Sequence, residues 1–146
     1  RIMICASEDV GNADPMAIVV ATSASQAVER IGMPEARIIL AQAAIYVACA
    51  PKSNACYMAI NMADVSVRNM KTTVPAHLQD AHYKGSSKLG HGVGYKYAHD
   101  YPGHFADLEF MPAELAGRRF YEPADNRQEE GLRSRLESLW PKYYGK

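Results

Sequence analysis

The first half of the chain alternates long apolar stretches with short helix-breaking signals. Apolar side chains fill most of residues 15–31 and 38–50, and Gly32 separates the two stretches. Asp14 before Pro15 is a typical helix start, because aspartate caps a free backbone N–H and proline at the first helical position has no N–H to satisfy. A glycine after a helix is a typical stop. The pattern predicts four helices, over residues 1–10, 15–31, 33–50 and 54–70, bounded further by Gly11, Pro51 and the N-cap candidate Ser53.

Only two to four residues join the last three of these helices, so sequential neighbours are expected to pack antiparallel, as in a helical bundle. The two apolar helices carry Ala, Ile and Val on every face, whereas an ordinary surface helix shows one apolar stripe. Helices of this kind are buried on more than one side. Either another subunit or a further part of the chain covers the second side, or the helices are central in the core. The pattern alone leaves both explanations open.

The second half of the chain loses this regularity. Residues 76–83 can form a short helix with His77 and Asp80 on one side, but closely spaced glycines then leave about twenty residues without a helical or strand period. Long irregular loops are usually functional or disordered, and four tyrosines within residues 74–104 argue for an ordered one. The remaining predictions are extended pieces at 106–111 and 117–123, a helical turn at 112–116, and a final helix from a cap at Asp125 to Trp140, docked through Leu132, Leu136, Leu139 and Trp140.

Composition places the chain among globular proteins. It has 146 residues, 48% of them hydrophobic, and a formal net charge of zero, which suits one domain with its own core. The longest uncharged run, residues 38–51, is shorter than the roughly 20 residues of a membrane span, so no membrane association is expected. Cys5, Cys49 and Cys56 fall in apolar helical patterns and are expected to be small buried side chains in a reducing cytoplasm.

Residues 74–104 contain all five histidines and most of the side chains that could carry chemistry. The glycines of residues 90–94 lack the spacing, the leading strand and the following helix of a phosphate-binding loop. The loop histidines and Asp100 show none of the usual metal-ligand spacings, so histidines bonded to the backbone are favoured over a metal site. No serine or cysteine stands in a nucleophile motif. The chain is therefore expected to hold no catalytic centre, cofactor or metal.

Lysines and tyrosines alternate in the same segment. Such a pairing can follow a nucleic-acid backbone while it stacks bases. Residues 68–104 carry five basic and two acidic side chains, which is only a modest excess. The alternative, which the pattern favours, is that the tyrosines pin the loop onto the helices and the lysines are merely solvated. The candidate contacts to DNA or a protein partner are Lys84, Lys88, His91, Tyr95, Lys96, Tyr97, His99, Arg118 and Arg119.

Six segments of the sequence carry a resemblance to a known protein family: ASEDVGNADP (6–15), GMPEARI (32–38), APKSNACYMAI (50–60), VPAHLQDAHYKG (74–85), LGHGVGYKYAHDYPG (89–103) and GRRFYEP (117–123). Together they resemble the C-terminal region of the replication-associated recombination ATPases. This is the RarA/MgsA family of AAA+ proteins, related to clamp loaders and to the Werner-helicase-interacting ATPase. Ala98 stands where the family usually has proline, and residues 61–73 diverge. The sequence contains no Walker A or Walker B motif, so it resembles the part that follows the ATPase core.

The resemblance implies an all-α fold. The region is expected to be an antiparallel helical bundle similar to the post-AAA+ oligomerisation domain, or collar, of clamp-loader subunits. Residues 1–146 would form a single domain of this kind, with a helical core over 1–72 and an irregular segment plus a C-terminal helix over 73–146.

The role implied for this region is non-catalytic. It would assemble a homotetramer of an ATPase that acts in DNA replication, recombination, repair and stalled-fork maintenance, in the cytoplasm at the nucleoid. ATP and Mg²⁺ would bind in the ATPase core, outside this chain, and DNA-dependent ATP hydrolysis would belong to the parent protein. The alternative is that residues 74–104 bind DNA or a replication protein such as single-stranded-DNA-binding protein. The sequence leaves open which partner that segment meets and how ATP hydrolysis is coupled to this domain.

Overall fold

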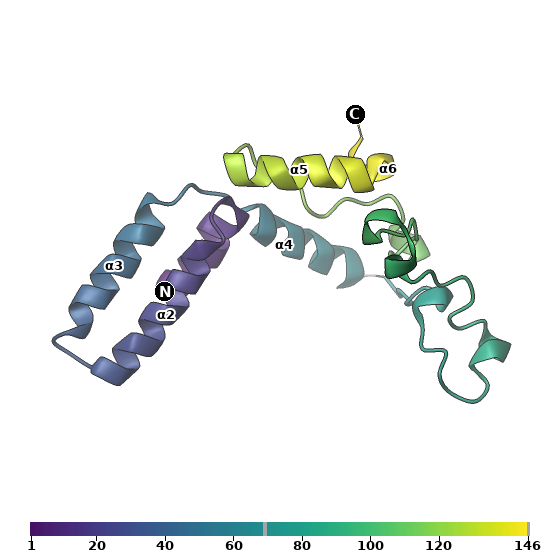
Figure 1. Ribbon diagram of the computed structural model, residues 1–146, viewed down its shortest axis with the longest axis horizontal. Helices are drawn as coiled ribbons and strands as arrows, with labels where there is room; N and C mark the ends of the chain where they lie inside the picture. Colours follow the sequence, from purple (N-terminus) through teal and green to yellow (C-terminus); the bar gives the residue numbers. More distant parts are fainter. Residues whose placement is uncertain (69, 146) are drawn as a thin grey trace. The chain divides into compact units, whose positions relative to one another are not determined.

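The computed structural model describes residues 1–68 and 70–145, and within them every regular element is helical. The all-α class is therefore confirmed (Figure 1). None of the helices in these ranges is both long enough and apolar enough to cross a membrane. The α-helices are α1 (Ile2–Cys5), α2 (Met16–Ile31), α3 (Ala36–Cys49), α4 (Ala55–Arg68), α5 (Arg127–Leu139) and α6 (Pro141–Tyr144).

The chain divides into two compact units. Unit 1 consists of Arg1–Ala63 together with Arg119–Lys146, and unit 2 of Asp64–Arg118. The C-terminal helices thus belong with the N-terminal ones, although the irregular segment separates them in sequence. Whether both units form a single post-AAA+ domain stays a prediction.

The first helix changes character before it ends. α1 continues into a π-helical turn, Ala6–Val10, and then a 3₁₀ turn, Gly11–Ala13. Gly11 has a φ of +50°, and a Cβ at this position would lie 3.0 Å from the carbonyl oxygen of Ser53. The helix predicted over residues 1–10 is confirmed, and its stop is a close backbone approach that only glycine allows.

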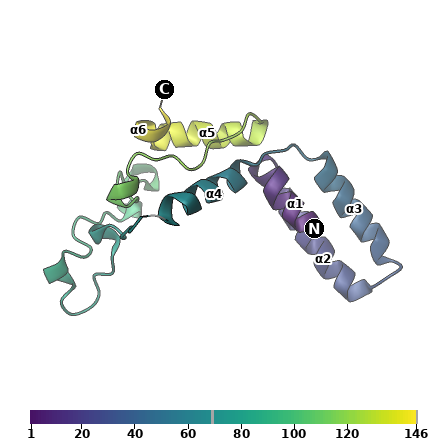
Figure 2. The ribbon, with the colours of Figure 1, turned by 180° about the vertical axis from the view of Figure 1, so that it is seen from behind.

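The helices α2 and α3 form an antiparallel hairpin (Figures 1 and 2). The predicted cap of α2 is confirmed, because Asp14 Oδ1 accepts a hydrogen bond from the Met16 N–H at 3.0 Å. Gly32 ends the helix with a φ of +74°, also as expected. Tyr46 near the end of α3 donates to Asp14 Oδ2 at 2.9 Å, which ties the two ends of the hairpin together. The buried seam consists of small residues, Ala17, Ala21, Ala24, Ala36, Ala43 and Val47.

The helix α4 does not extend this hairpin into a regular array. Its predicted cap is confirmed, since Ser53 Oγ accepts from the Ala55 N–H at 3.3 Å. However, the Ser53 N–H donates to the Asp9 carbonyl oxygen at 2.8 Å, which attaches the start of α4 to the end of the first helix rather than alongside α3. The helix is described to Arg68, two residues before its expected end. The antiparallel arrangement therefore holds for α2 and α3 but not for α3 and α4.

The helix α5 begins one residue later than predicted. Its N-cap is Asn126, whose Oδ1 accepts from the Glu129 N–H at 3.0 Å, and not Asp125, which is exposed. Asn126 has the extended backbone of an N-cap residue, with φ −148° and ψ 160°. The predicted docking residues Leu132, Leu136, Leu139 and Trp140 are half-buried.

Unit 2 contains the end of α4 followed by short 3₁₀ turns. The helix expected over residues 76–83 is wrong: only Ala76–Leu78 is helical. Asp80 Oδ1 accepts from the His82 N–H at 2.9 Å, and this local turn competes with a helix. The helical turn expected at 112–116 is confirmed as Ala113–Leu115. The other 3₁₀ turns are Ser86–Leu89, Ala98–Asp100 and Pro102–His104.

Candidate interaction surfaces

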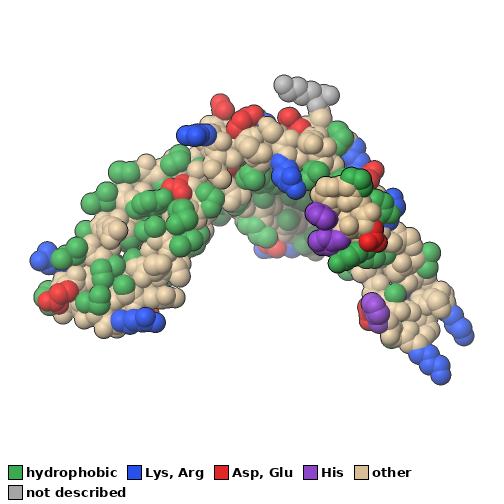
Figure 3. Space-filling view, viewed as in Figure 1, with side chains coloured by type: hydrophobic (Ala, Val, Ile, Leu, Met, Phe, Trp, Pro, Cys, Tyr) green, Lys and Arg blue, Asp and Glu red, His purple; other side chains and the backbone are tan. Residues whose placement is uncertain are grey.

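The hairpin exposes large apolar side chains because its core is made of small ones. On α3, the buried residues Ala36, Ala43 and Val47 recur at helical spacing and face α2. Ile38 and Ile45 are seven residues apart and therefore share the opposite face, where they are 62% and 64% exposed. Figure 3 shows hydrophobic side chains spread over the visible surface of this hairpin. Of the two explanations that the sequence left open, a second face that this chain leaves uncovered fits the structure, whereas a central position of α3 in the core does not.

A groove of about 460 Å³ runs along one side of the same hairpin. Small side chains form its floor, and Met16 and Val19 of α2 stand exposed at its edge. Ile39 and Gln42 contribute the α3 side. A groove with an apolar floor and exposed apolar edges can receive the side chains of another helix.

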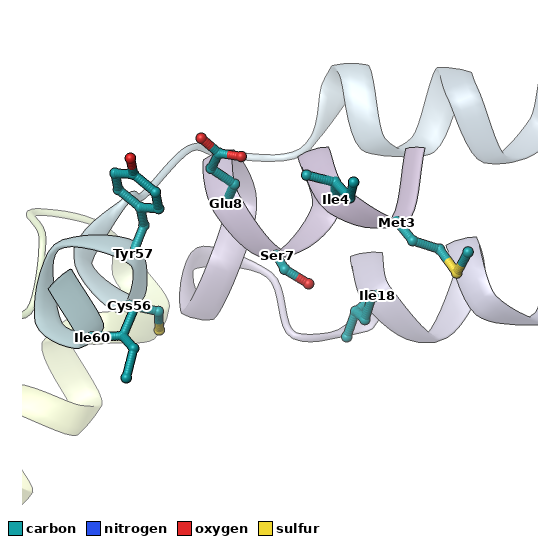
Figure 4. A pocket seen from close by; sticks show the side chains of 8 residues that line it. All are labelled: Met3, Ile4, Ser7, Glu8, Ile18, Cys56, Tyr57 and Ile60. Atoms are coloured by element: carbon teal, nitrogen blue, oxygen red, sulfur yellow. The ribbon is translucent and has the colours of Figure 1, made fainter. Parts of the chain in front are cut away.

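A second apolar groove, of about 520 Å³, lies elsewhere in unit 1 (Figure 4). Three helices contribute to it, and Glu8 on the π-helical turn is its one ionisable carboxylate. The residues that line it are Met3, Ile4, Ser7, Glu8, Ile18, Cys56, Tyr57 and Ile60. Cys5 and Cys56 are half-buried, whereas Cys49 is exposed, so the expectation of a buried thiol is wrong for Cys49. The Asp9 carboxylate hydrogen-bonds to Cys5 and raises the pKa of its thiol.

Unit 1 also buries a charged residue that the sequence analysis did not single out. Glu129 is fully buried, and its carboxylate accepts from the Tyr121 hydroxyl at 2.7 Å and from Asn126 Nδ2 at 2.5 Å. Burial alone would raise the pKa of Glu129, but hydrogen bonds from Tyr121, Ser53 and Asn126 outweigh it and hold the pKa below its usual value. Glutamate three residues after an N-cap is the available sequence signal, and it belongs to a capping pattern rather than to an active site.

The tyrosines of residues 74–104 keep much of their surface exposed. Tyr83, Tyr95, Tyr97 and Tyr101 are all exposed in this chain, the middle two by more than half. The favoured interpretation of the sequence, in which the tyrosines pin the segment onto the helices, stays a prediction, because most of those helices belong to unit 1. Their exposed surface is available to a partner.

The candidate residues at the start of this segment make few contacts. Lys84 and Lys88 are exposed and form no ion pair within the part of the chain that the structure describes. His91 is half-buried, and its Nδ1 lies 2.7 Å from the Tyr83 hydroxyl. The Asp80 carboxylate accepts from the His82 backbone and ring, which lowers the pKa of Asp80.

The next candidates form a connected row. The Tyr97 and His99 ring centroids lie 5.0 Å apart, and those of His99 and His104 lie 4.9 Å apart. Lys96 Nζ lies 6.0 Å from the Tyr101 ring centroid and donates to the Asp107 carbonyl oxygen at 3.4 Å. The structure thus brings Lys96, Tyr97 and His99 into one stretch of surface, while Tyr95 stands exposed beside them in sequence. Across the described residues, no group of three or more His, Cys, Asp or Glu side chains is placed to hold a metal ion.

The two arginines of the candidate set make separate contacts. Arg118 Nη1 donates to Ser66 Oγ at 3.0 Å within unit 2. Arg119 pairs with Glu122, Nε to Oε1 at 3.1 Å, and its guanidinium lies 5.7 Å from the Tyr144 ring centroid within unit 1. Both side chains already serve contacts inside their own units. Their role in DNA or partner contact stays a prediction.

Comparison with known proteins decides the family. The family model for the C-terminal region of MgsA AAA+ ATPases matches residues 1–140. The chain belongs to this family. It is 45% identical over 140 residues to an uncharacterised AAA domain-containing protein of Mycobacterium tuberculosis, covering 95% of this chain and 31% of that protein.

Two further relatives are both called replication-associated recombination protein A. The Bacillus subtilis protein is 43% identical over 84% of this chain and 30% of its own length. The Escherichia coli protein is 44% identical over 90% of this chain and 30% of its own length. The resemblance to the RarA/MgsA family is confirmed, and this C-terminal AAA+ region spans about a third of the curated relatives it matches.

Proposed function

We propose that this chain is a homo-oligomerisation domain of an AAA+ ATPase. The observation that carries the proposal is the outer face of α3, where Ile38 and Ile45 are 62% and 64% exposed opposite a buried alanine seam. Exposed isoleucines at helical spacing are unfavourable in water and favour coverage by an apolar surface. A second copy of the same hairpin offers such a surface, together with the groove between α2 and α3.

The energy available supports self-association. Covering about 400 Å² of apolar surface in total between two copies would contribute on the order of 10 kcal/mol before association costs. Those costs are of the order of 4 to 15 kcal/mol, so one such face is marginal for a stable dimer. Because the hairpin groove and the groove of Figure 4 add further apolar surface, a larger assembly such as a homotetramer is favoured.

The parent protein would supply the chemistry. We propose that ATP and Mg²⁺ bind in an ATPase core outside this chain and that the chain itself holds no catalytic centre. Relatives named for replication-associated recombination support a role in DNA replication and recombination. We extend this proposal to repair at stalled forks in the nucleoid. The domain would keep several ATPase cores together.

Sedimentation velocity of the chain at tens of micromolar tests this proposal. We expect an assembly larger than a dimer, and a monomer would contradict it. Ile38→Glu with Ile45→Glu is expected to shift the protein to smaller species, because each change places a charge on the proposed contact face. Both positions are already exposed, so the monomer is expected to fold normally by far-UV circular dichroism.

A matched control separates the apolar face from a simple change in net charge. Ser134 and Ser138 are exposed positions on α5, and Ser134→Glu with Ser138→Glu adds the same two charges to a polar helix of the same unit. This variant is expected to keep the wild-type assembly. Equal disruption by the α3 and α5 variants would show that the α3 face is not the contact.

A second candidate function is partner binding by residues 74–104, favoured by the exposed tyrosines and by lysines without ion pairs. The partner would be DNA or a replication protein such as single-stranded-DNA-binding protein. Replacing Lys84, Lys88 and Lys96 by alanine in the whole AAA+ protein is expected to lower DNA affinity and its salt dependence. Unchanged affinity and salt dependence would contradict the DNA version.

A further inference from the structure

The rings of unit 2 form a continuous exposed row. Tyr97, His99 and His104 succeed one another at centroid distances of 5.0 and 4.9 Å, with tilted planes. His99 and His104 come from two consecutive 3₁₀ turns, Ala98–Asp100 and Pro102–His104, and Tyr97 directly precedes the first. Figure 3 shows histidine side chains at the surface of this unit. The row is therefore a feature of the surface and not of a core.

Three tyrosines near this row are exposed in the part of the chain that the structure describes. Tyr95 and Tyr97 are 55% and 56% exposed, and Tyr101 is 38% exposed. Tyrosines that stabilise a loop normally bury the ring and leave the hydroxyl in water. Here large amphipathic side chains keep a third to a half or more of their surface exposed, as in surfaces that bind ligands.

The backbone adds an independent observation at the end of the row. His104 has a φ of +53°, and it is the one residue other than glycine with a positive φ in the described ranges. A left-handed conformation costs a β-carbon-bearing residue of order 1 kcal/mol and clusters at binding sites. In this conformation the His104 ring lies against that of His99. This strained backbone conformation therefore lies at one end of the ring row.

The charges decide between single-stranded and duplex nucleic acid. Residues 74–104 contain three lysines and two aspartates, a net charge of only +1 with neutral histidines. Duplex binding depends on neutralising many phosphates, which this segment cannot do. Stacking on exposed rings requires open base faces, which a single strand offers and a duplex hides. Lys96, beside Tyr101, is placed to meet one phosphate.

We propose that the row formed by Tyr97, His99 and His104 binds single-stranded nucleic acid by stacking its bases, with Lys96 near the backbone. This inference rests on the second candidate function and names its ligand and its contacts. In this proposal, stacking of bases on the rings contributes more of the binding energy than attraction between charges. Sequence preference is accordingly weak, because every base has a face to stack.

Fluorescence anisotropy of a labelled oligothymidylate of about 20 nucleotides, titrated with the whole chain, tests the proposal. The wild type is expected to bind the single strand at least ten-fold more tightly than a duplex of the same length. Tyr97→Leu and His99→Leu are each expected to weaken binding roughly ten-fold, whereas Tyr97→Phe keeps the ring and the affinity. Lys96→Gln is expected to lower the salt dependence by about one phosphate contact.

The control is Phe110→Leu, which removes an exposed aromatic ring of unit 2 outside the row and is expected to leave binding unchanged. Wild-type affinity in Tyr97→Leu would overturn the proposal. Equal binding of single strand and duplex, weakened only by Lys96→Gln, would also overturn it while leaving DNA contact by the segment intact. If neither DNA binds, the DNA version of the second function falls as well, and a protein becomes the partner. Sedimentation of each variant shows whether self-association is unaffected.

Discussion

The Tyr121 hydroxyl donates a 2.7 Å hydrogen bond to Oε1 of Glu129, a carboxylate with no exposed surface. Glu129 lies in the first turn of α5, and its other oxygen accepts from the N-cap residue Asn126. The same side chain also receives a hydrogen bond from Ser53, the cap of α4. One buried carboxylate therefore joins the starts of two helices that are far apart in the sequence.

Removing the Tyr121 hydroxyl tests this arrangement. Tyr121→Phe keeps the ring but leaves a buried carboxylate oxygen without its donor, which is expected to cost about 1 to 3 kcal/mol. Urea unfolding measures the change. Tyr57→Phe removes the hydroxyl of an exposed tyrosine and is expected to change the free energy of unfolding by less than about 0.5 kcal/mol. Equal effects in the two variants would mean that the hydrogen bond to Glu129 is unimportant.

The pKa of Glu129 predicts a loss of stability in acid. Its hydrogen bonds hold the folded-state pKa below the ordinary value of 4.5, so the unfolded chain binds a proton more readily. The stabilisation is complete above that ordinary value and is lost as the pH falls through the lower folded-state pKa. Glu129→Gln is expected to be less stable at neutral pH but to depend less on pH below about 4.5, as urea unfolding across that range would show. Asp80, whose pKa is also lowered, remains in both proteins and cancels in the comparison.

The raised pKa of Tyr121 predicts that the protein loses stability as the pH rises in the alkaline range. Burial, followed by the hydrogen bond to Glu129, raises its pKa from 10.0 to about 12. A raised pKa means that the folded state keeps its proton longer, so the stabilisation is present below pH 10 and is lost as the pH approaches 12. The pKa values of Tyr46 and Tyr144 are also raised, so absorbance of tyrosinate should show several late-titrating groups, one fewer in Tyr121→Phe. Identical titration curves would contradict the assignment.

Local signals in the sequence predicted local structure well. Helices begin after Asp14 and Ser53 and end at Gly32 as expected. Capping and left-handed helix ends depend on neighbouring residues alone. The course of α4 was not predictable, since it depends on the Ser53 N–H bonding to the distant Asp9 carbonyl. For the candidate site, the types and order of the residues were enough to indicate a segment rich in aromatic side chains. Which of its rings contact one another, and how far each is exposed, depends on the folded backbone and could not be predicted from residue types.

The cap of α5 gives a paired test of neighbouring residues. Asn126 Oδ1 accepts from the Glu129 N–H at 3.0 Å, whereas Asp125 is exposed. Asn126→Ala is expected to lower the free energy of unfolding by about 1 kcal/mol or more, because it also removes a donor to the Glu129 side chain. Asp125→Ala is expected to change it by less than about 0.5 kcal/mol. If Asp125→Ala were the more destabilising of the two variants, Asp125 would be the cap of α5.

Two glycines of unit 2 separate backbone strain from steric overlap. Gly92 and Gly94 both have positive φ, +73° and +83°, so alanine at either position is strained by roughly 1 to 2 kcal/mol. A Cβ at Gly92 would also lie 2.6 Å from the Cβ of Ala81, while one at Gly94 would meet nothing within 4 Å.

Gly92→Ala is therefore expected to destabilise unit 2 by about 1 to 3 kcal/mol more than Gly94→Ala. The overlap would also strain the 2.9 Å hydrogen bond from the Gly92 N–H to the Ala76 carbonyl oxygen. Native-state hydrogen exchange resolves this, because the Gly92 amide should lose more protection in Gly92→Ala than in Gly94→Ala, while amides of α2 stay unchanged. Equal loss in both variants would mean that the turn at residues 90–94 opens freely and that contact with Ala81 does not hold it.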